Sequence, residues 1–114
     1  MHPERFLPLT PVVFEIALAL AAGERHGYEI MQDVERRTDG HIVLHPGTLY
    51  RALGRLLDQG LIEELDERPA AGDDDERRRY YRLSALGQAV ARAEVERLAS
   101  QVSAARRVFR GDRA

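Results

Sequence analysis

The sequence predicts a small, mainly α-helical protein in which three helices are followed by a two-stranded β-hairpin and one long C-terminal helix. Apolar residues recur at helical intervals in three segments before residue 60. Two segments of strand-like composition then flank an aspartate-rich loop, and a last helical pattern extends to about residue 110. The 114 residues have room for one hydrophobic core.

The first two helices are marked by clear start and stop residues. Thr10 and Pro11 suit a helix start, because threonine caps helix N-termini and proline fits the first helical position. The apolar residues that follow cover most of the circumference, so we expect this helix to be buried on several sides, and Gly23 to end it. A second helix is expected over about residues 26–37, with Gly40 beyond its end. Its apolar stripe consists of Tyr28, Ile30, Met31 and Val34.

The third helix is expected to open at His45 and Pro46 and to end at Gly60, after a short strand or extended link over residues 42–44. Leucines at intervals of three and four form one apolar face. These residues are Leu49, Leu53, Leu56 and Leu57. Because this face must pack on the first two helices, the remaining faces are available to a partner.

The hairpin is expected from strands over residues 61–65 and 79–84, which flank a loop with proline, glycine and acidic residues at 68–76. The second strand alternates, with Tyr81 and Leu83 on one side of the sheet and Tyr80 and Arg82 on the other.

A long helix should follow from Ser84, a suitable cap, to about Arg110. Gly87 should weaken this helix by about 1 kcal/mol relative to alanine. Three helices followed by a hairpin is the order of a winged helix-turn-helix. We therefore expect a DNA-binding part over residues 1–84 and a dimerisation helix over residues 85–114.

Several short motifs make this expectation more specific. Gly-Glu-Arg-His-Gly-Tyr ends at Tyr28, and Pro-Gly-Thr-Leu-Tyr begins at Pro46. Gly-Leu-Ile ends at Ile62, and the second wing strand includes Tyr-Tyr-Arg-Leu-Ser, which ends at Ser84. In this order and spacing, over about residues 9–98, the chain resembles the PadR family of bacterial transcriptional regulators, in its shorter branch with one helix after the wing.

The resemblance implies a homodimeric repressor that binds an inverted-repeat operator, often in its own promoter, and that a small molecule or stress signal releases in some members. Two positions depart from the family pattern. Gly54 stands where the family often has a polar or basic side chain, so that a DNA contact is lost or the backbone approaches closely. His45 replaces a small polar cap.

The third helix and the wing carry the candidate DNA contacts. Thr48, Tyr50, Arg51 and Arg55 lie off the leucine face, and either arginine could donate two hydrogen bonds to guanine. Tyr50 could instead belong to the core. Arg77, Arg78 and Arg79 precede the second wing strand and suit phosphate contacts, unless they pair with the acidic residues 73–76.

The last helix carries an apolar seam at intervals of three and four, which is typical of a helix that pairs with another helix. It consists of Val95, Leu98, Val102, Ala105 and Phe109. An earlier stripe of Leu86, Val90 and Ala93 should pack on the domain. One intramolecular core is the alternative, although so long a helix should overhang a small domain.

Composition and motifs narrow the classes of protein to which the chain could belong. The formal net charge is −2 and every basic residue is arginine, so positive charge must be gathered locally if DNA is bound. We find no cysteine, signal peptide or apolar stretch long enough to span a membrane, and expect a cytoplasmic protein. No catalytic or cofactor motif is evident, and the histidines suit turns and caps better than a metal site. A protein–protein adaptor without DNA binding and, more remotely, a ligand-handling or enzymatic module are the alternatives.

Overall fold

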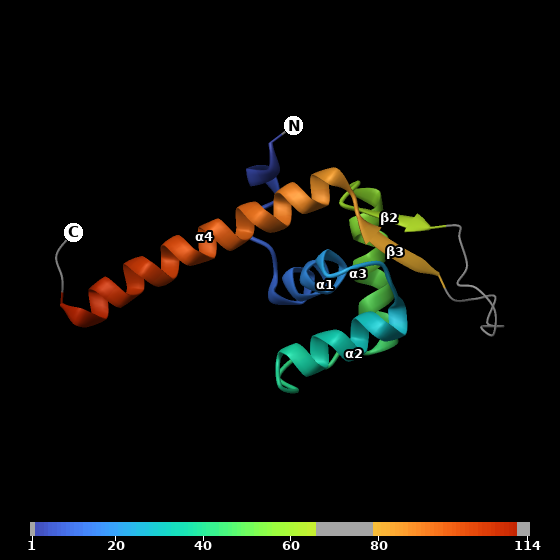
Figure 1. Cartoon of the computed structure of the whole chain (residues 1–114), viewed down its shortest axis with the longest axis horizontal. Coiled ribbons are helices and arrows are strands. Elements are labelled where there is room, and N and C mark those ends of the chain that lie inside the picture. Colours follow the sequence, from blue (N-terminus) through green and yellow to red (C-terminus); the bar gives the residue numbers. More distant parts are fainter. Residues whose placement is uncertain (1, 66–78, 112–114) are drawn as a thin grey trace.

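The computed structural model describes residues 2–65 and 79–111 and confirms the order of the expected helices and strands (Figure 1). Two short elements were not anticipated, a 3₁₀ helix before the first α-helix and a strand before the second. The elements are η1 (Pro3–Phe6), α1 (Pro11–Ala21), β1 (Arg25–His26), α2 (Gly27–Arg37), α3 (Pro46–Asp58), β2 (Ile62–Leu65), β3 (Tyr80–Leu83) and α4 (Ala85–Arg110).

Side-chain caps fix the starts of three helices. Thr10 Oγ1 accepts a hydrogen bond from Val13 N at the start of α1, and Ser84 Oγ accepts one from Gly87 N at the start of α4. At α2 the cap is His26, whose Nδ1 accepts from Glu29 N at 3.3 Å while Glu29 Oε1 accepts from His26 N at 3.1 Å. This reciprocal pair satisfies two donors at a helix start, so His26 has a structural role.

The wing belongs to a three-stranded antiparallel sheet in the order β1-β3-β2. Ile62 faces Leu83 across the hairpin, and β1 adds to the other edge of β3, where Arg25 faces Tyr81. The alternation in β3 is confirmed, since Tyr81 and Leu83 are buried while Arg82 is exposed. Residues 42–44 form no strand and are the extended link between α2 and α3.

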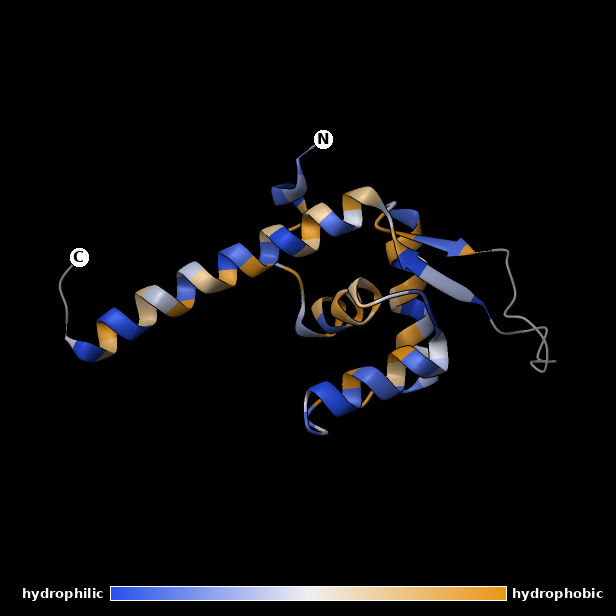
Figure 2. Ribbon diagram, viewed as in Figure 1, coloured by the Kyte–Doolittle hydropathy of each residue, from blue (hydrophilic) through white to orange (hydrophobic). Residues whose placement is uncertain are grey.

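The core lies between α1, α2, α3, the sheet and the first half of α4. Figure 2 shows α1 as the most uniformly apolar of these helices, and residues on several of its sides are buried, as expected. The buried set includes Ile16, Leu20, Ile30, Val34, Leu49, Leu53, Leu56, Tyr81 and Val90. Tyr28 is the correction to the predicted α2 stripe, because it is 59% exposed.

Helix α4 leaves the body of the molecule halfway along its length (Figure 1). Its buried face includes Gly87, Val90 and Ala91, whereas every residue from 99 to 110 is exposed. Gly87 is more than a weak point in the helix. A Cβ at this position would lie 1.9 Å from the carbonyl oxygen of Leu61, so glycine is what allows α4 to pack on the chain entering β2.

A buried carboxylate ties the N-terminal segment to α4. Glu94 is 1% exposed, and its Oε2 accepts hydrogen bonds from Leu9 N at 2.8 Å and from Arg97 Nη2 at 3.1 Å. The hydrogen bonds from Arg97 lower the pKa of Glu94 despite its burial, and the backbone bond from Leu9 acts in the same direction. This clasp holds η1 and the start of α1 against α4, and no sequence pattern indicated it.

Candidate nucleic-acid interface

Helix α3 separates a leucine face from an exposed polar face. Leu49, Leu53 and Leu56 are buried, whereas Thr48 and Arg51 are exposed. This division follows from the three-and-four spacing of the leucines, which directs them to the core shared with α1 and α2. The expected DNA-contact residues of this helix, Tyr50 and Arg55 included, are therefore at the surface.

The first turn of α3 is suited to an anion. Its first intrahelical hydrogen bond runs from Leu49 N to His45 O, so the N–H groups of Gly47 and Thr48 have no acceptor within the helix. The turn contains no acidic residue, and the side chain of His45 makes no capping bond. A Cβ on Gly47 would lie 3.8 Å from Arg51 Nη1, so the guanidinium group lies over this turn. Free N–H groups, the helix dipole and a cation thus converge at one end of α3.

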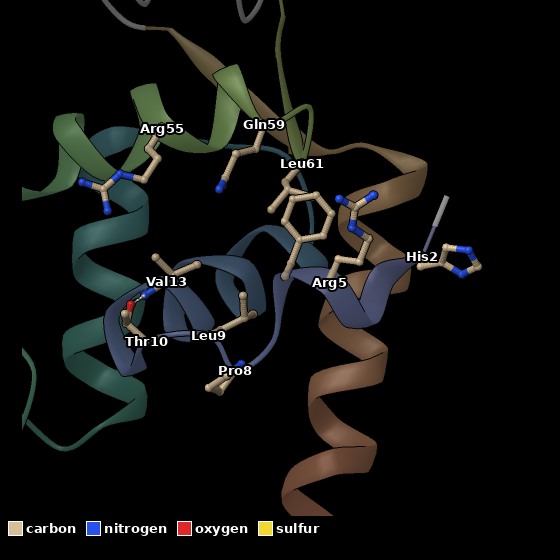
Figure 3. A pocket seen from close by; sticks show the side chains of 10 residues that line it. His2, Arg5, Pro8, Leu9, Thr10, Val13, Arg55, Gln59 and Leu61 are labelled. Carbon is tan, nitrogen blue, oxygen red and sulfur yellow. Dashed lines mark hydrogen bonds between the residues drawn. The ribbon is translucent and has the colours of Figure 1, made fainter.

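Arg55 lies one helical turn further along α3 than Arg51. It lines a hollow that also involves η1 and α1, and Figure 3 shows its side chain on the side of α3 nearest Val13 and Thr10. Within the part of the chain that the structure describes, neither Arg51 nor Arg55 has a recorded carboxylate partner. The surroundings of the two arginines nevertheless differ, because Arg51 lies over the first turn of α3 and Arg55 beside the hollow.

Tyr50 is 51% exposed and so is not a core residue. Its ring lies against the start of α2, where a Cβ on Gly27 would lie only 2.4 Å from the tyrosine hydroxyl oxygen. Gly27 thus makes room for Tyr50. Tyr28, which follows Gly27 in the chain, is also exposed, so two exposed tyrosines lie near the starts of α2 and α3. Helical spacing could have indicated the exposure of Tyr28. It lies two residues before Ile30 and so on nearly the opposite side of α2, whereas Ile30 and Val34, four residues apart, share the buried face.

The described part of the wing carries cross-strand ion pairs. Arg79 Nη1 lies 3.1 Å from Glu64 Oε2, and Arg82 Nε lies 2.8 Å from Glu63 Oε1. Arg79 is therefore paired locally, with Glu64 of the neighbouring strand. The acidic stretch over residues 73–76, together with Arg77 and Arg78, lies outside the described residues.

The predicted seam on α4 lies at the surface. Val95 is 44% exposed, Val102 48% and Phe109 91%, while Leu98 is half-buried and Ala105 is exposed. The distal seam is therefore not part of the intramolecular core. A hollow of about 630 Å³ runs beside it and is also lined by Phe14 of α1.

The structure also bears on metal binding by the histidines and on whether a helix of the described residues could span a membrane. No group of three or more metal-ligating side chains occurs within residues 2–65 and 79–111. His41 Nδ1 lies 2.8 Å from the carbonyl oxygen of Thr38, and His45 stands at the exposed start of α3. Among the helices of these ranges, none combines the length and apolar character that crossing a membrane requires.

Comparison with known proteins gives a consistent result. The model of the transcriptional regulator PadR-like family matches residues 16–93. An uncharacterised protein of Lysinibacillus sphaericus is 37% identical over 68 residues, which are 58% of this chain and 58% of that protein. The match thus spans less than two thirds of that relative.

Solved structures share the fold. A transcriptional regulator from Clostridium thermocellum is 27% identical, with a TM-score of 0.69 over 84% of this chain and 87% of that chain. Bacillus subtilis PadR in complex with operator DNA is 20% identical, with a TM-score of 0.63 over 75% of this chain and 48% of that chain.

Proposed function

Because the chain belongs to the PadR-like family of transcriptional regulators, we propose that it is a homodimeric repressor that binds an inverted-repeat DNA operator. The observation that carries the proposal is the first turn of α3, where unpaired N–H groups and the Arg51 guanidinium face solvent together. The fold shared with a PadR protein bound to operator DNA supports the same conclusion.

In this proposal α3 enters the major groove by its N-terminal half. Thr48 and the helix N-terminus bind a phosphate oxygen, which fixes the position of the helix along the DNA backbone. Arg51 is the better placed of the two candidate base readers, because it lies over the first turn of α3, whereas Arg55 lies one turn further along, beside the hollow lined by residues of η1 and α1. A bidentate arginine–guanine contact discriminates against other bases by about 1–3 kcal/mol. Tyr50, half exposed beside α2, is placed for an apolar or sugar contact.

The wing adds contacts that do not depend on sequence. Arg79 is held by Glu64 in a pair whose side chains are 64% and 33% exposed, and such pairs contribute about 0–1 kcal/mol. A phosphate can therefore replace Glu64 as the partner of Arg79. Arg77 and Arg78 are proposed to act in the same way. Each arginine that binds phosphate releases counterions, so affinity should fall steeply as salt is raised.

Dimerisation is proposed to use the exposed seam of α4. The seam repeats at the spacing of a two-helix interface, and its apolar side chains have no place in the core of their own chain. A dimer through residues 85–114 would present two copies of α3, and a two-fold axis would relate two half-sites about 34 Å, or one DNA turn, apart. This arrangement requires an operator with inverted-repeat symmetry.

A mobility-shift titration tests the proposal on the DNA upstream of the protein's own gene, with a scrambled duplex of equal length as competitor. We expect a discrete complex that the scrambled duplex does not displace, and repression of a reporter driven by the same region. Failure to bind either duplex would favour an adaptor that binds proteins.

Base reading by Arg51 is tested with a randomised operator. Arg51→Ala should relax the preference at one base step in each half-site, whereas Arg92→Ala, an exposed change on α4, should retain the profile. A wild-type profile for Arg51→Ala and a relaxed one for Arg55→Ala would reverse the assignment.

A further inference from the structure

Two neighbouring residues, His26 and Gly27, connect the wing to α3. His26 lies opposite Tyr80 in the pairing of β1 with β3, and the two rings meet edge to face with their centroids 5.2 Å apart. Gly27 leaves room for Tyr50 of α3, because a Cβ at this position would collide with the tyrosine hydroxyl group. The start of α2 therefore contacts both elements that carry the candidate DNA contacts.

The ring of His26 is held in place by its own helix. The residue is only 6% exposed. Its Nδ1 accepts the hydrogen bond from Glu29 N, and its Nε2 lies 3.5 Å from Glu29 Oε1. Because a change of rotamer would break the cap of α2, the ring presents a fixed surface to the wing.

The backbone pairing at this edge of the sheet is short. Strand β1 has two residues, so it adds only the register pairs of Arg25 with Tyr81 and of His26 with Tyr80. Side-chain pairs across the strands are the main source of stability in an antiparallel pair. The edge-to-face contact between His26 and Tyr80 therefore helps to set where β3 lies relative to α2.

We propose that His26 is a positioning residue for DNA binding, whose ring sets the wing relative to α3. This inference rests on the proposed function, because it requires α3 and the wing to contact the same DNA molecule. Arg79, the candidate phosphate contact, immediately precedes Tyr80 and is exposed. A displacement of Tyr80 thus moves Arg79 relative to the DNA backbone. His26 is buried and acts through Tyr80, without touching the DNA.

The variant His26→Asn separates the ring from the cap. Asparagine is among the best N-cap residues and can accept the bond from Glu29 N, but it has no ring to contact Tyr80. We expect this variant to bind the operator about threefold to tenfold more weakly than the wild type. The slope of log affinity against log salt should fall by about 1, which is the share of one phosphate contact.

Two readouts show whether the effect is confined to the wing. The base preference of His26→Asn on a randomised operator should equal that of the wild type, because α3 is unchanged. His41→Asn is the matched control, since His41 is an exposed histidine on the turn after α2. It should retain the affinity and the salt slope of the wild type.

Changes at Tyr80 test the same contact from the wing. Tyr80→Ala should reproduce the loss, whereas Tyr80→Phe keeps the ring and should bind as the wild type does. Combining His26→Asn with Tyr80→Ala should weaken binding no more than either change alone, because the contact is already lost. In the DNA-free protein, Tyr80→Ala should shift the NMR resonances of the His26 ring protons, and Tyr80→Phe should largely preserve them.

Wild-type affinity and salt slope in both His26→Asn and Tyr80→Ala would overturn the positioning role. Additive losses in the double variant, an equal loss in Tyr80→Phe, or a relaxed base preference in His26→Asn would also overturn it, because the effect would not pass through the ring contact. Should His26→Asn fail to fold, the comparison of Tyr80→Ala with Tyr80→Phe decides. If the wild type binds no duplex, the proposed function fails and the positioning role fails with it, even where the NMR shifts reveal the ring contact.

Discussion

The two glycines inside long helices should respond to alanine in opposite ways. Gly54 in α3 has no neighbouring atom within 4 Å of a built Cβ, so Gly54→Ala gains only helix propensity, about 1 kcal/mol of unfolding free energy. Gly87 in α4 would place its Cβ 1.9 Å from Leu61 O and 2.9 Å from Leu61 C. Both are backbone atoms and cannot move aside by changing a rotamer.

The destabilisation expected for Gly87→Ala follows from the hydrogen bonds around Leu61. Its carbonyl oxygen accepts a hydrogen bond from Ser84 N at 3.0 Å, and Ser84 Oγ donates to Gly60 O at 2.6 Å. Moving α4 away to admit a methyl group strains both bonds. Overpacking of this kind costs about 1–3 kcal/mol or more. After the propensity gain, we expect Gly87→Ala to lower the unfolding free energy by up to about 2 kcal/mol, and the two variants to differ by about 1–3 kcal/mol.

Urea denaturation followed by circular dichroism measures the difference, with all proteins at one concentration so that self-association affects each of them equally. The midpoint should rise for Gly54→Ala and fall for Gly87→Ala, with similar slopes. If Gly87→Ala is as stable as Gly54→Ala, α4 does not pack on the carbonyl of Leu61 and the described junction is wrong.

Three further predictions concern the seam, the wing and the clasp. Replacing Leu98 and Val102 with glutamate should produce monomers in sedimentation velocity, and a persistent dimer would place the interface elsewhere. Arg79→Ala should reduce the slope of log affinity against log salt by about 1, whereas an unchanged slope would mean that Arg79 stays paired in the complex. Glu94→Gln should lower the unfolding free energy at neutral pH by about 1–3 kcal/mol. Since Arg97 holds the pKa of Glu94 below its ordinary value of 4.5, this stabilisation is complete above that value and is lost as the pH falls through the lowered pKa. A difference in unfolding free energy between the wild type and Glu94→Gln that does not change with pH would contradict this role of Glu94.

The elements that sequence analysis predicted are those with local signals. The caps at Thr10 and Ser84, the leucine face of α3 and the alternation in β3 each depend on residues a few positions apart. Such patterns determine helix and strand faces directly. The exposure of Arg51 followed in the same way from the position of the leucines.

Other features depend on contacts between distant residues. The bond from Leu9 to Glu94 joins positions 85 residues apart, and β1 is two residues long, too short for any alternation to appear. Gly87 suggested a weak helix, and only its position beside Leu61 shows why glycine is needed. The different surroundings of Arg51 and Arg55 also required three dimensions, because Arg51 lies over the first turn of α3 while Arg55 lines a hollow shared with η1 and α1.

Selection of binding sites from a pool of random duplexes tests the central claim most directly, because the protein itself chooses the operator sequence. Repeated rounds with the full chain at moderate salt should enrich an inverted repeat whose half-sites lie about one DNA turn apart. Arg51→Ala should enrich a repeat that is degenerate at one base step of each half-site. A pool that stays random after selection, or that enriches only a single unpaired site, would contradict the proposed dimeric, sequence-specific DNA-binding function.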